Sequence, residues 1–275
     1  MSEPPRLTEQ QFERFRAFIY HHSGIRMDAT KITLVSNRIR RRLKAEGIDD
    51  FDAYYRHLTS SQGAGELECF LDAITTNETH FFRTDPHFQW FKQDFLGELV
   101  SRRLRNEHPA SLRVWSAACS TGEEPYTLAI CVAENMLRLR DWKISILGTD
   151  ISEAALKDAR TAVYRQRSLE EVSPVQLRRY FDEVEPTTWQ VRPSVRNVVE
   201  FRRHNLMEKL RLPAFDCIFI RNVLIYFDRE SKQKVVKNLI DSLARGGYLV
   251  VGPSEGIYDM LSPLEKLSTF LYRKS

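Results

Sequence analysis

The chain of 275 residues is 42% hydrophobic, enough to bury a large core, and its 41 basic and 37 acidic side chains leave a formal charge of only +4. This balance excludes a strong global field, so any basic surface must be local. The opening segment MSEPPRLTEQ has no basic-then-apolar leader pattern, and no apolar run approaches the ~20 residues of a membrane span, so we expect a cytoplasmic protein.

The cysteines and histidines do not form a recognisable metal or disulfide pattern. No CxxC pair and no HExxH motif occurs, and the cysteines are widely scattered: Cys69, Cys119, Cys131 and Cys217. The adjacent His21 and His22 would point about 100° apart on a helix, and no further ligand follows at a suitable spacing. We therefore expect neither a disulfide framework nor a metal site.

Residues 1–75 show apolar spacings of three and four residues and no strand-like alternation, which predicts an all-helical N-terminal domain. Thr8 and Gln11 are placed to form a capping box at the start of its first helix, and Gly24 lies beyond the end of that helix. A second helix follows Asp28 and ends before Gly47.

The second helix contains no acidic residue between Lys31 and Lys44. Its basic side chains are Arg38, Arg40, Arg41, Arg42 and Lys44. Such a helix would be attracted to nucleic acid or to an acidic protein helix, although a solvated charged face is an equal alternative. No aromatic residues alternate with the arginines, as a base-stacking surface would require.

The chain from residue 76 to 275 has the pattern of a Rossmann-like domain. A helix is predicted to begin with Asp85 as its N-cap and Pro86 in its first turn, and to run to the polar stretch near Asn106. Beyond it, strand-like runs alternate with helical stretches, which is typical of a mostly parallel sheet; the runs are LRVWSA, KISILGTD, FDCIFIRN and GYLVVGP. The alternating segment from Thr188 to Arg203 predicts a small antiparallel ribbon, over about residues 186–204, or else an extension of the main sheet at its edge.

The first strand leads into AACSTGEEPYTLA, a loop of small residues before a helix, and such a loop forms the floor of a ligand pocket in parallel sheets. The loop has one glycine, Gly122, instead of GxGxxG, and Glu123 and Glu124 stand where a pyrophosphate would meet the helix. These acids disfavour a phosphorylated ligand. They suit S-adenosylmethionine, which has an ammonium and a sulfonium group.

Further polar residues follow the other strands at the same sheet edge. Asp150 ends the strand LGTD, where it could accept hydrogen bonds from ribose hydroxyls or cap the helix that starts at Ser152. Asn205 follows the ribbon, and Arg221-Asn222 ends the strand FDCIFI. Adenine recognition is a natural role for these amides.

The segments TTNETHFFR (75–83), SAACSTGEEPY (116–126), GTDIS (148–152) and RNVLIYF (221–227) resemble the motifs of CheR-type chemotaxis receptor methyltransferases in order and spacing. The resemblance covers essentially the whole chain. It implies that the family's contacts to S-adenosylmethionine, or to its product S-adenosylhomocysteine, fall on Asn77, Thr79, Arg83, Glu124, Asp150, Asn205, Leu206, Arg221 and Asn222. Spacing alone does not separate Glu123 from Glu124, and the resemblance selects the second.

By the same resemblance, the enzyme esterifies glutamate side chains on the cytoplasmic helical bundle of chemoreceptors, in sensory adaptation, and the basic helix meets the acidic bundle. Tyr226 is then a wall of the methyl-transfer site. Some relatives bind a peptide at the receptor's C-terminus through a glycine-containing loop near the ribbon. Here EPTTWQVRPS has no glycine, so we expect recognition that does not depend on the tail. Separately, we expect the enzyme to be a monomer.

A glutamate acceptor has an ordinary pKa near ~4.3 and is ionised at neutral pH, so no general base is needed. We hypothesise that Arg83 holds one carboxylate oxygen while the other attacks; in the alternative, Arg83 forms an ion pair with Asp150 or Glu124 in the cofactor pocket. Two competing functions are a nucleic-acid methyltransferase, disfavoured because RNVLIYF contains no Asn/Asp-Pro-Pro-aromatic motif, and a non-catalytic cofactor sensor.

Overall fold

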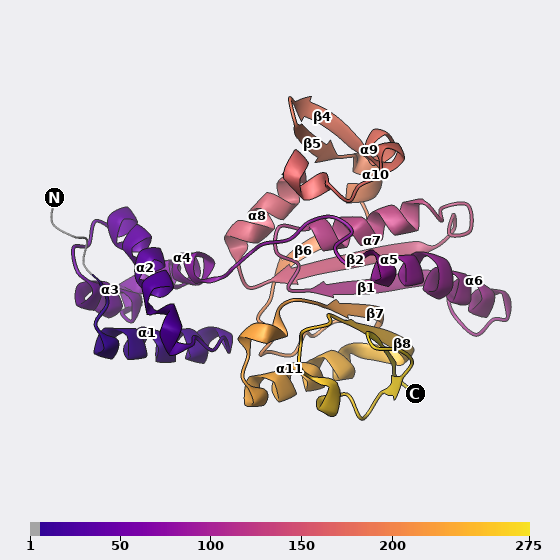
Figure 1. Ribbon diagram of the computed structural model, residues 1–275. Coiled ribbons are helices and arrows are strands. Elements are labelled where there is room, and N and C mark those ends of the chain that lie inside the picture. Colours follow the sequence, from indigo (N-terminus) through magenta and orange to yellow (C-terminus); the bar gives the residue numbers. More distant parts are fainter. Residues whose placement is uncertain (1–5) are drawn as a thin grey trace.

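The computed structural model describes residues 6–275 and places a helical domain beside a larger α/β domain (Figure 1). Residues 1–5, which belong to the opening segment examined for a leader pattern, lie outside the described residues. No helix in the described part of the chain is both long and apolar enough to cross a bilayer.

The helical domain begins with the capping box predicted from sequence. Thr8 Oγ1 accepts a hydrogen bond from the Gln11 amide, and the Gln11 side chain accepts one from the Thr8 amide. Gly24 and Gly47 end the first two helices in the left-handed conformation, with φ of 74° and 65°. The helices are α1 (Glu9–Ser23), α2 (Ile32–Glu46), α3 (Phe51–Leu58) and α4 (Ala64–Ile74).

Two basic side chains of α2 are not free for a partner. Arg42 Nε donates to Glu66 Oε1 on α4 across 2.8 Å, and its Nη2 donates to Glu46 across 2.8 Å. Glu66 also accepts from the Tyr54 hydroxyl and is buried. Arg38 donates to the chain that follows α4. The expectation of one open basic surface is therefore wrong at Arg38 and Arg42, because groups distant in sequence pack against them.

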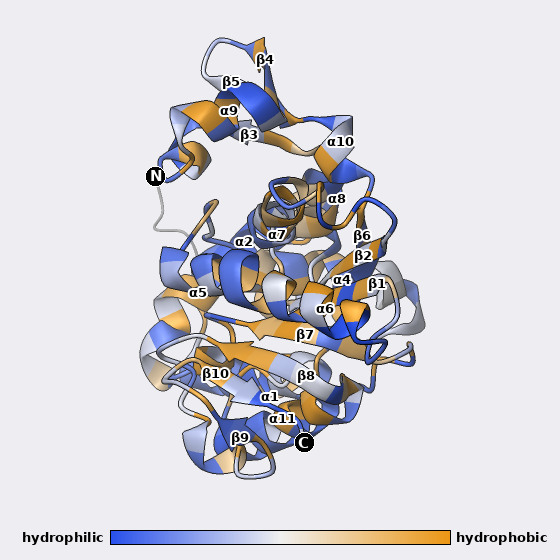
Figure 2. Cartoon of the chain, turned by 90° about the vertical axis from the view of Figure 1, so that its right-hand side faces the viewer, coloured by the Kyte–Doolittle hydropathy of each residue, from blue (hydrophilic) through white to orange (hydrophobic). Residues whose placement is uncertain are grey.

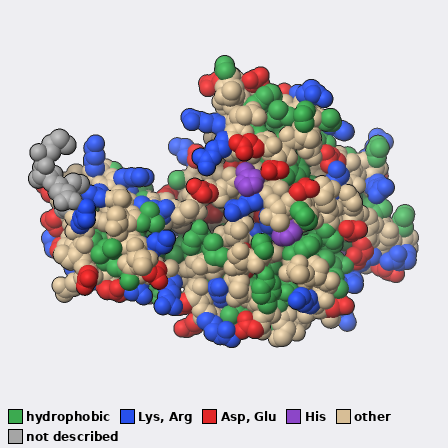
Figure 3. All heavy atoms as spheres, viewed as in Figure 1, with side chains coloured by type: hydrophobic (Ala, Val, Ile, Leu, Met, Phe, Trp, Pro, Cys, Tyr) green, Lys and Arg blue, Asp and Glu red, His purple; other side chains and the backbone are tan. Residues whose placement is uncertain are grey.

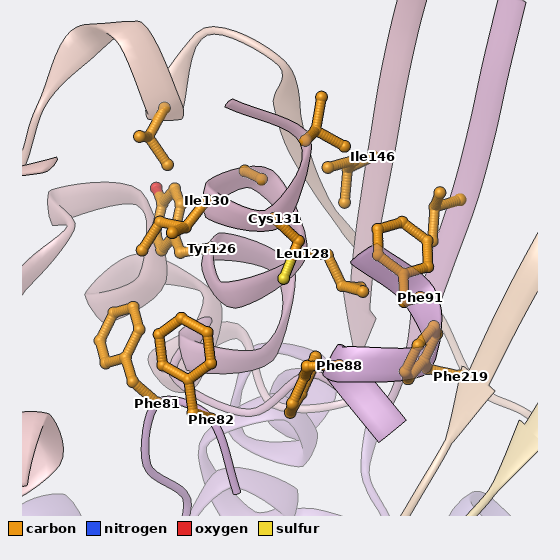
Figure 4. Packing of buried hydrophobic residues seen from close by; sticks show 14 of the residues in the cluster. Phe81, Phe82, Phe88, Phe91, Tyr126, Leu128, Ile130, Cys131, Ile146 and Phe219 are labelled. Carbon is orange, nitrogen blue, oxygen red and sulfur yellow. The ribbon is translucent and has the colours of Figure 1, made fainter. Parts of the chain in front are cut away.

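The helix predicted from Asp85-Pro86 contains α5 (Asp85–Trp90), a π-helical turn (Phe91–Phe95) and α6 (Leu96–Leu104). Its N-cap is Thr84, with φ of 63°, and Asp85 is the first helical residue, so the predicted N-cap was one residue late. Aromatic side chains of this helix pack on the sheet, as Phe88 and Phe91 do against Phe219 in Figure 4.

The predicted parallel sheet is confirmed. Its strand order is β6-β2-β1-β7-β8-β10-β9, and the first five strands are parallel. The strands are β1 (Ser111–Ala117), β2 (Lys143–Asp150), β6 (Val199–Arg203), β7 (Phe215–Ile220), β8 (Leu243–Val251), β9 (Glu265–Lys266) and β10 (Leu271–Arg273). Apolar strands form the centre of the domain (Figure 2). Helices α6 and α7 (Glu123–Ala133) cover one face and α11 (Arg229–Ser242) the other, while α8 (Glu153–Thr161) lies beside β6.

The small antiparallel sheet has a different composition from the predicted ribbon. It contains β3 (Val163–Arg165), β5 (Thr188–Val191) and β4 (Phe181–Glu185), in that order, with α9 (Pro174–Tyr180) and α10 (Pro193–Arg196) beside them. The second half of the predicted ribbon, β6, instead pairs with β2 in the main sheet. The interpretation of residues 188–203 as one ribbon was therefore wrong, because strand alternation does not identify the partner strand. For Val199–Arg203 the alternative, an extension of the main sheet at its edge, is confirmed.

Candidate active site

A cavity of about 550 Å³ lies at the carboxyl ends of β1, β2 and β7, facing the helical domain. Every residue predicted for the site lines it: Asn77, Thr79, Arg83, Glu124, Asp150, Asn205, Leu206, Arg221, Asn222 and Tyr226. In Figure 3 the surface is hollowed between the helical domain and the small sheet. The rule that ligands bind beyond the carboxyl ends of parallel strands thus located the cavity.

The loop after β1 brings backbone close to the cavity. Ala118, Ser120 and Gly122 have φ of 61°, 51° and 93°, and the first two are rare conformations for residues with a Cβ. A Cβ at Gly122 would lie 2.8 Å from the Ala159 Cβ, so only glycine fits there. The Ser120 hydroxyl donates to the Asn77 carbonyl across 3.0 Å, which ties this loop to the segment after α4.

Asp150 is buried at the end of β2 and is held by two backbone amides. Its Oδ2 accepts from Ser120 N across 2.8 Å, and its Oδ1 accepts from Ser152 N across 2.9 Å. Burial raises the pKa of Asp150, although these amides oppose the shift. Ser152 is itself the N-cap of α8, accepting from Ala155 N, so the alternative role of Asp150 as that cap is wrong.

The tertiary structure gives the two adjacent glutamates, Glu123 and Glu124, different environments. Glu124 lines the cavity, where it accepts from the Ser116 hydroxyl across 2.7 Å and from Arg221 Nη1 across 2.9 Å. Glu123 is buried outside the cavity lining, accepts from the Thr121 hydroxyl, and has a pKa that burial raises. Helical geometry turns successive side chains about 100° apart, which puts only one of them on the cavity side.

Arg221 connects three segments of the site. Besides the ion pair with Glu124, its guanidinium donates to the Arg83 carbonyl oxygen and lies 5.1 Å from the centre of the Phe88 ring. Only 2% of its side chain is exposed. A charge this buried requires a fixed partner, so Arg221 and Glu124 act together in setting the shape of the cavity.

Arg83 forms no ion pair with Asp150 or Glu124 among the described residues. Its guanidinium donates to the Glu78 carbonyl across 3.1 Å, and Glu124 is paired with Arg221 instead. The hypothesis of an ion pair to either acid was therefore wrong. His80 lies nearby, and burial, with the charge of Arg83, lowers its pKa.

The side chains that line the cavity carry charges of both signs, so the pocket is not acidic throughout. The basic side chains that line it are Arg26, Lys31, Arg38, Arg83 and Arg221, and the acidic ones are Asp28, Glu78, Glu124 and Asp150. Arg26, Lys31 and Arg38 come from the helical domain, which the sequence did not place at the cavity. A mixed lining matches a ligand with charges of both signs, and S-adenosylmethionine has a carboxylate beside its ammonium and sulfonium groups.

Two predicted amides and one leucine lie at the rim. Asn205 donates from Nδ2 to the His22 carbonyl across 2.8 Å and accepts from Met207 N across 3.0 Å, so its amide links α1 to the α/β domain. One Nδ2 hydrogen and one Oδ1 lone pair remain. Leu206 is buried, and Asn222 has φ of 57°.

Sequence reasoning missed Glu255, which is fully buried after β8. Its carboxylate accepts from three successive backbone amides, those of Asn222, Val223 and Leu224, the last across 2.7 Å. It therefore fixes the segment RNVL after β7. A signal was present, because Glu255 follows the strand GYLVVGP at the same sheet edge as the other site residues.

The helical domain closes the cavity on the side of Tyr226. Arg26 N donates to the Tyr226 carbonyl across 2.8 Å, and Ile25 forms an antiparallel bridge with Phe227. Tyr226 is 38% exposed. This tyrosine thus stands at the mouth of the cavity, between the two domains.

Comparison with known proteins identifies similar chains along nearly the whole sequence. Residues 77–271 match the family model described as "CheR methyltransferase, SAM binding domain", and residues 10–75 match "CheR methyltransferase, all-alpha domain". The chemotaxis protein methyltransferase of Salmonella typhimurium is 36% identical over 95% of this chain and 88% of its own length. That of Escherichia coli K12 is 37% identical over 93% and 87%, and chemotaxis protein methyltransferase 1 of Pseudomonas aeruginosa is 37% identical over 90% and 91%.

Proposed function

The chain belongs to the CheR methyltransferase family, and we propose that it uses the cavity to esterify glutamate side chains of a chemoreceptor. It is an S-adenosylmethionine-dependent methyltransferase of chemotaxis whose substrate is a chemoreceptor. The observation that supports the glutamate assignment most is that cationic side chains line the same cavity as an exposed tyrosine, Tyr226.

The residues present fit the cofactor. The volume of about 550 Å³ lies in the range of small-molecule sites, and the lining offers a carboxylate, amides and guanidinium groups. In the proposal, Asp150 accepts from the ribose hydroxyls, Asn205, Leu206 and Asn222 surround the adenine, and the remaining contacts to the amino-acid part come from the segment that holds Asn77, Thr79 and Arg83, from Glu124, and from Arg221. When bound, S-adenosylmethionine supplies an electrophilic methyl group.

The chain's own contribution to methyl transfer is positional. The acceptor carboxylate is already ionised at neutral pH, so no side chain has to remove a proton. Within residues 6–275 the Arg83 guanidinium has one hydrogen-bond partner, the Glu78 carbonyl, which supports its role in holding one carboxylate oxygen of the acceptor. Tyr226 limits the approach of the acceptor and excludes water from it.

The role of Arg83 is tested by comparing turnover with cofactor affinity. Arg83→Ala should reduce kcat by about 100-fold or more, because orientation supplies most of the rate. If Arg83 acts on the acceptor, the affinity for S-adenosylhomocysteine measured by calorimetry falls much less than kcat. An equal fall in both quantities would contradict the acceptor role and leave a cofactor contact.

We place the receptor-binding surface on the part of α2 whose basic side chains remain available. Arg41 and Lys44 are exposed, and Arg40 is half-buried with a hydrogen bond to Asn37. A basic surface beside the cavity suits an acidic helical bundle in the cytoplasm. Reversing the charge in Arg41→Glu/Lys44→Glu should raise the KM for receptor several-fold and weaken its salt dependence. An unchanged KM would show that the receptor-binding surface lies elsewhere.

Recognition independent of the receptor's C-terminal tail also remains part of the proposal, as does a monomeric enzyme. The β4–β5 connection contains no glycine, and Thr187 takes its left-handed position with φ of 62°. Calorimetry of the full chain with a receptor tail peptide should give no measurable heat, and micromolar binding would reject this part.

One assay tests the reaction as a whole. Purified chain, a labelled methyl donor and receptor fragments should yield label on protein that alkali releases, as carboxyl esters do. Alkali-stable label, label on nucleic acid, or no label with intact cofactor binding would each contradict glutamate esterification.

A further inference from the structure

Arg38 has a different environment from the exposed basic residues of α2. Its Nη1 donates to the Ile74 carbonyl and, across 3.1 Å, to the Thr75 carbonyl, while Nη2 donates to the Thr76 hydroxyl across 2.9 Å. These acceptors are the last residue of α4 and the two residues after it. A cation at carbonyl groups that end a helix is a stabilising cap.

The segment held by Arg38 leads directly into the cavity. Asn77 and Thr79, which line the cavity, follow the last bonded residue, Thr76, by one and three positions. The path of the chain is also fixed from the other side, because the Ser120 hydroxyl donates to the Asn77 carbonyl. The segment 75–79 is therefore hydrogen-bonded to α2 on one side and to the loop after β1 on the other. Figure 1 shows the chain running from α4 to the α/β domain here.

We infer that Arg38 is a positioning residue for the cofactor site, which sets the path of residues 75–79 so that Asn77 and Thr79 enter the cavity. Two arginines of α2 that lie three residues apart then have different tasks: Arg38 organises the methyl-donor site, and Arg41 serves the receptor surface. The helical domain is then required for cofactor affinity as well as for receptor binding. The inference rests on the proposed cofactor contacts of Asn77 and Thr79.

The test compares single-charge deletions on the same helix in the full chain. Arg38→Ala should weaken S-adenosylhomocysteine binding in calorimetry by about tenfold or more, the usual effect of losing charge-assisted hydrogen bonds. Arg41→Ala, which removes the same charge three residues away, should leave that affinity within about twofold, because an exposed charge contributes little. A salt-independent loss in Arg38→Ala distinguishes geometry from a general field.

A second pair of variants separates positioning from a general loss of stability. Thr76→Val removes one acceptor at an exposed position and should weaken binding by a few-fold, and Arg38→Ala/Thr76→Val should bind no worse than Arg38→Ala alone. Arg38→Lys retains the positive charge but not the several N–H donors of the planar guanidinium, so it should recover only part of the affinity for S-adenosylhomocysteine. If Arg38→Ala does not fold, Thr76→Val and Arg38→Lys decide the question.

The outcomes that overturn the inference are distinct. Unchanged S-adenosylhomocysteine affinity in Arg38→Ala, with a raised KM for receptor, would make Arg38 a receptor contact. If the effects of Arg38→Ala and Thr76→Val on S-adenosylhomocysteine affinity simply add in the double variant, the hydrogen bond between the two side chains does not contribute. Asn77→Ala is the control for the proposed cofactor contacts: if this variant binds S-adenosylhomocysteine normally, those contacts are wrong. If Asn77→Ala binds it weakly but Arg38→Ala binds it normally, the positioning role of Arg38 is wrong.

Discussion

The guanidinium of Arg221 donates to Glu124 Oε2 across 2.9 Å, and the two side chains, distant in sequence, share one wall of the cofactor cavity. The carboxylate has a second partner in the Ser116 hydroxyl. Glu124 is therefore both a lining group of the cavity and the counter-charge of a buried arginine. Its two functions should be separable by measuring stability and ligand affinity on the same variants.

Glu124→Gln should lower the free energy of unfolding by about 3 kcal/mol, because removing one partner leaves the Arg221 charge buried without its anion. We expect S-adenosylhomocysteine affinity to fall by at least tenfold in the same variant. Urea denaturation and calorimetry measure the two effects. Glu123→Gln is the matched control: its affinity should equal that of the wild type, and a comparable loss there would contradict the assignment of the two glutamates.

The free energy of unfolding should depend on pH through the protonation of Glu123. Burial raises its pKa in the folded state, so between the ordinary glutamate pKa and the raised value the folded chain binds more protons than the unfolded chain. This group's contribution to the free energy of unfolding therefore grows as pH falls through that window and is least favourable at neutral pH.

Glu123→Gln removes the cost of the buried charge while retaining an acceptor for Thr121. We expect the variant to be more stable than the wild type at pH 7 and the difference to shrink as the pH is lowered toward 5. Urea denaturation at several pH values measures this difference. A variant less stable than the wild type at neutral pH would mean that the charge of Glu123 is favourable where it lies.

Glu255 should matter for the site although it is remote from the chemistry. In Glu255→Gln an amide group replaces one carboxylate oxygen that accepts from the amides of residues 222–224, so at least one donor loses its partner, at a cost of about 1–3 kcal/mol. We expect weaker S-adenosylhomocysteine binding and a lower kcat, since Asn222 lies in that segment and Tyr226 comes two residues after it. Glu265→Gln, an exposed glutamate on β9, is the control, and equal behaviour of both variants would refute the prediction.

Two glycines with the same role allow the contact between the domains to be measured. Gly24 and Gly47 each end a helix at positive φ. A Cβ at Gly24 would lie 2.6 Å from the Met207 sulfur and 3.0 Å from the Phe227 ring, whereas a Cβ at Gly47 would have no neighbour within 4 Å in the part of the chain that the structure describes. Gly47→Ala should cost about 1 kcal/mol for the backbone alone. Gly24→Ala should cost about 1–3 kcal/mol more, because the domains must move apart. Thermal unfolding measures both, and equal losses would show that Met207 adapts freely.

Much of the fold and the site was predictable because its signals are local. The capping box of Thr8 and Gln11 joins residues three positions apart, and the core strands follow from runs of apolar residues. The cavity followed from a topological rule, since residues after parallel strands meet at one edge of the sheet. That rule placed Asp150 and Arg221 together without knowledge of any contact.

Only the tertiary structure decided which groups pair. Arg42 looked unneutralised along the chain, but Glu66, 24 residues later, meets it across the helical domain. The segment Val199–Arg203 alternates as a ribbon strand would, yet it pairs in parallel with β2. The physical reason is that periodicity and capping depend on near neighbours, whereas hydrogen-bond partners and ion pairs are selected when distant segments pack and exclude water.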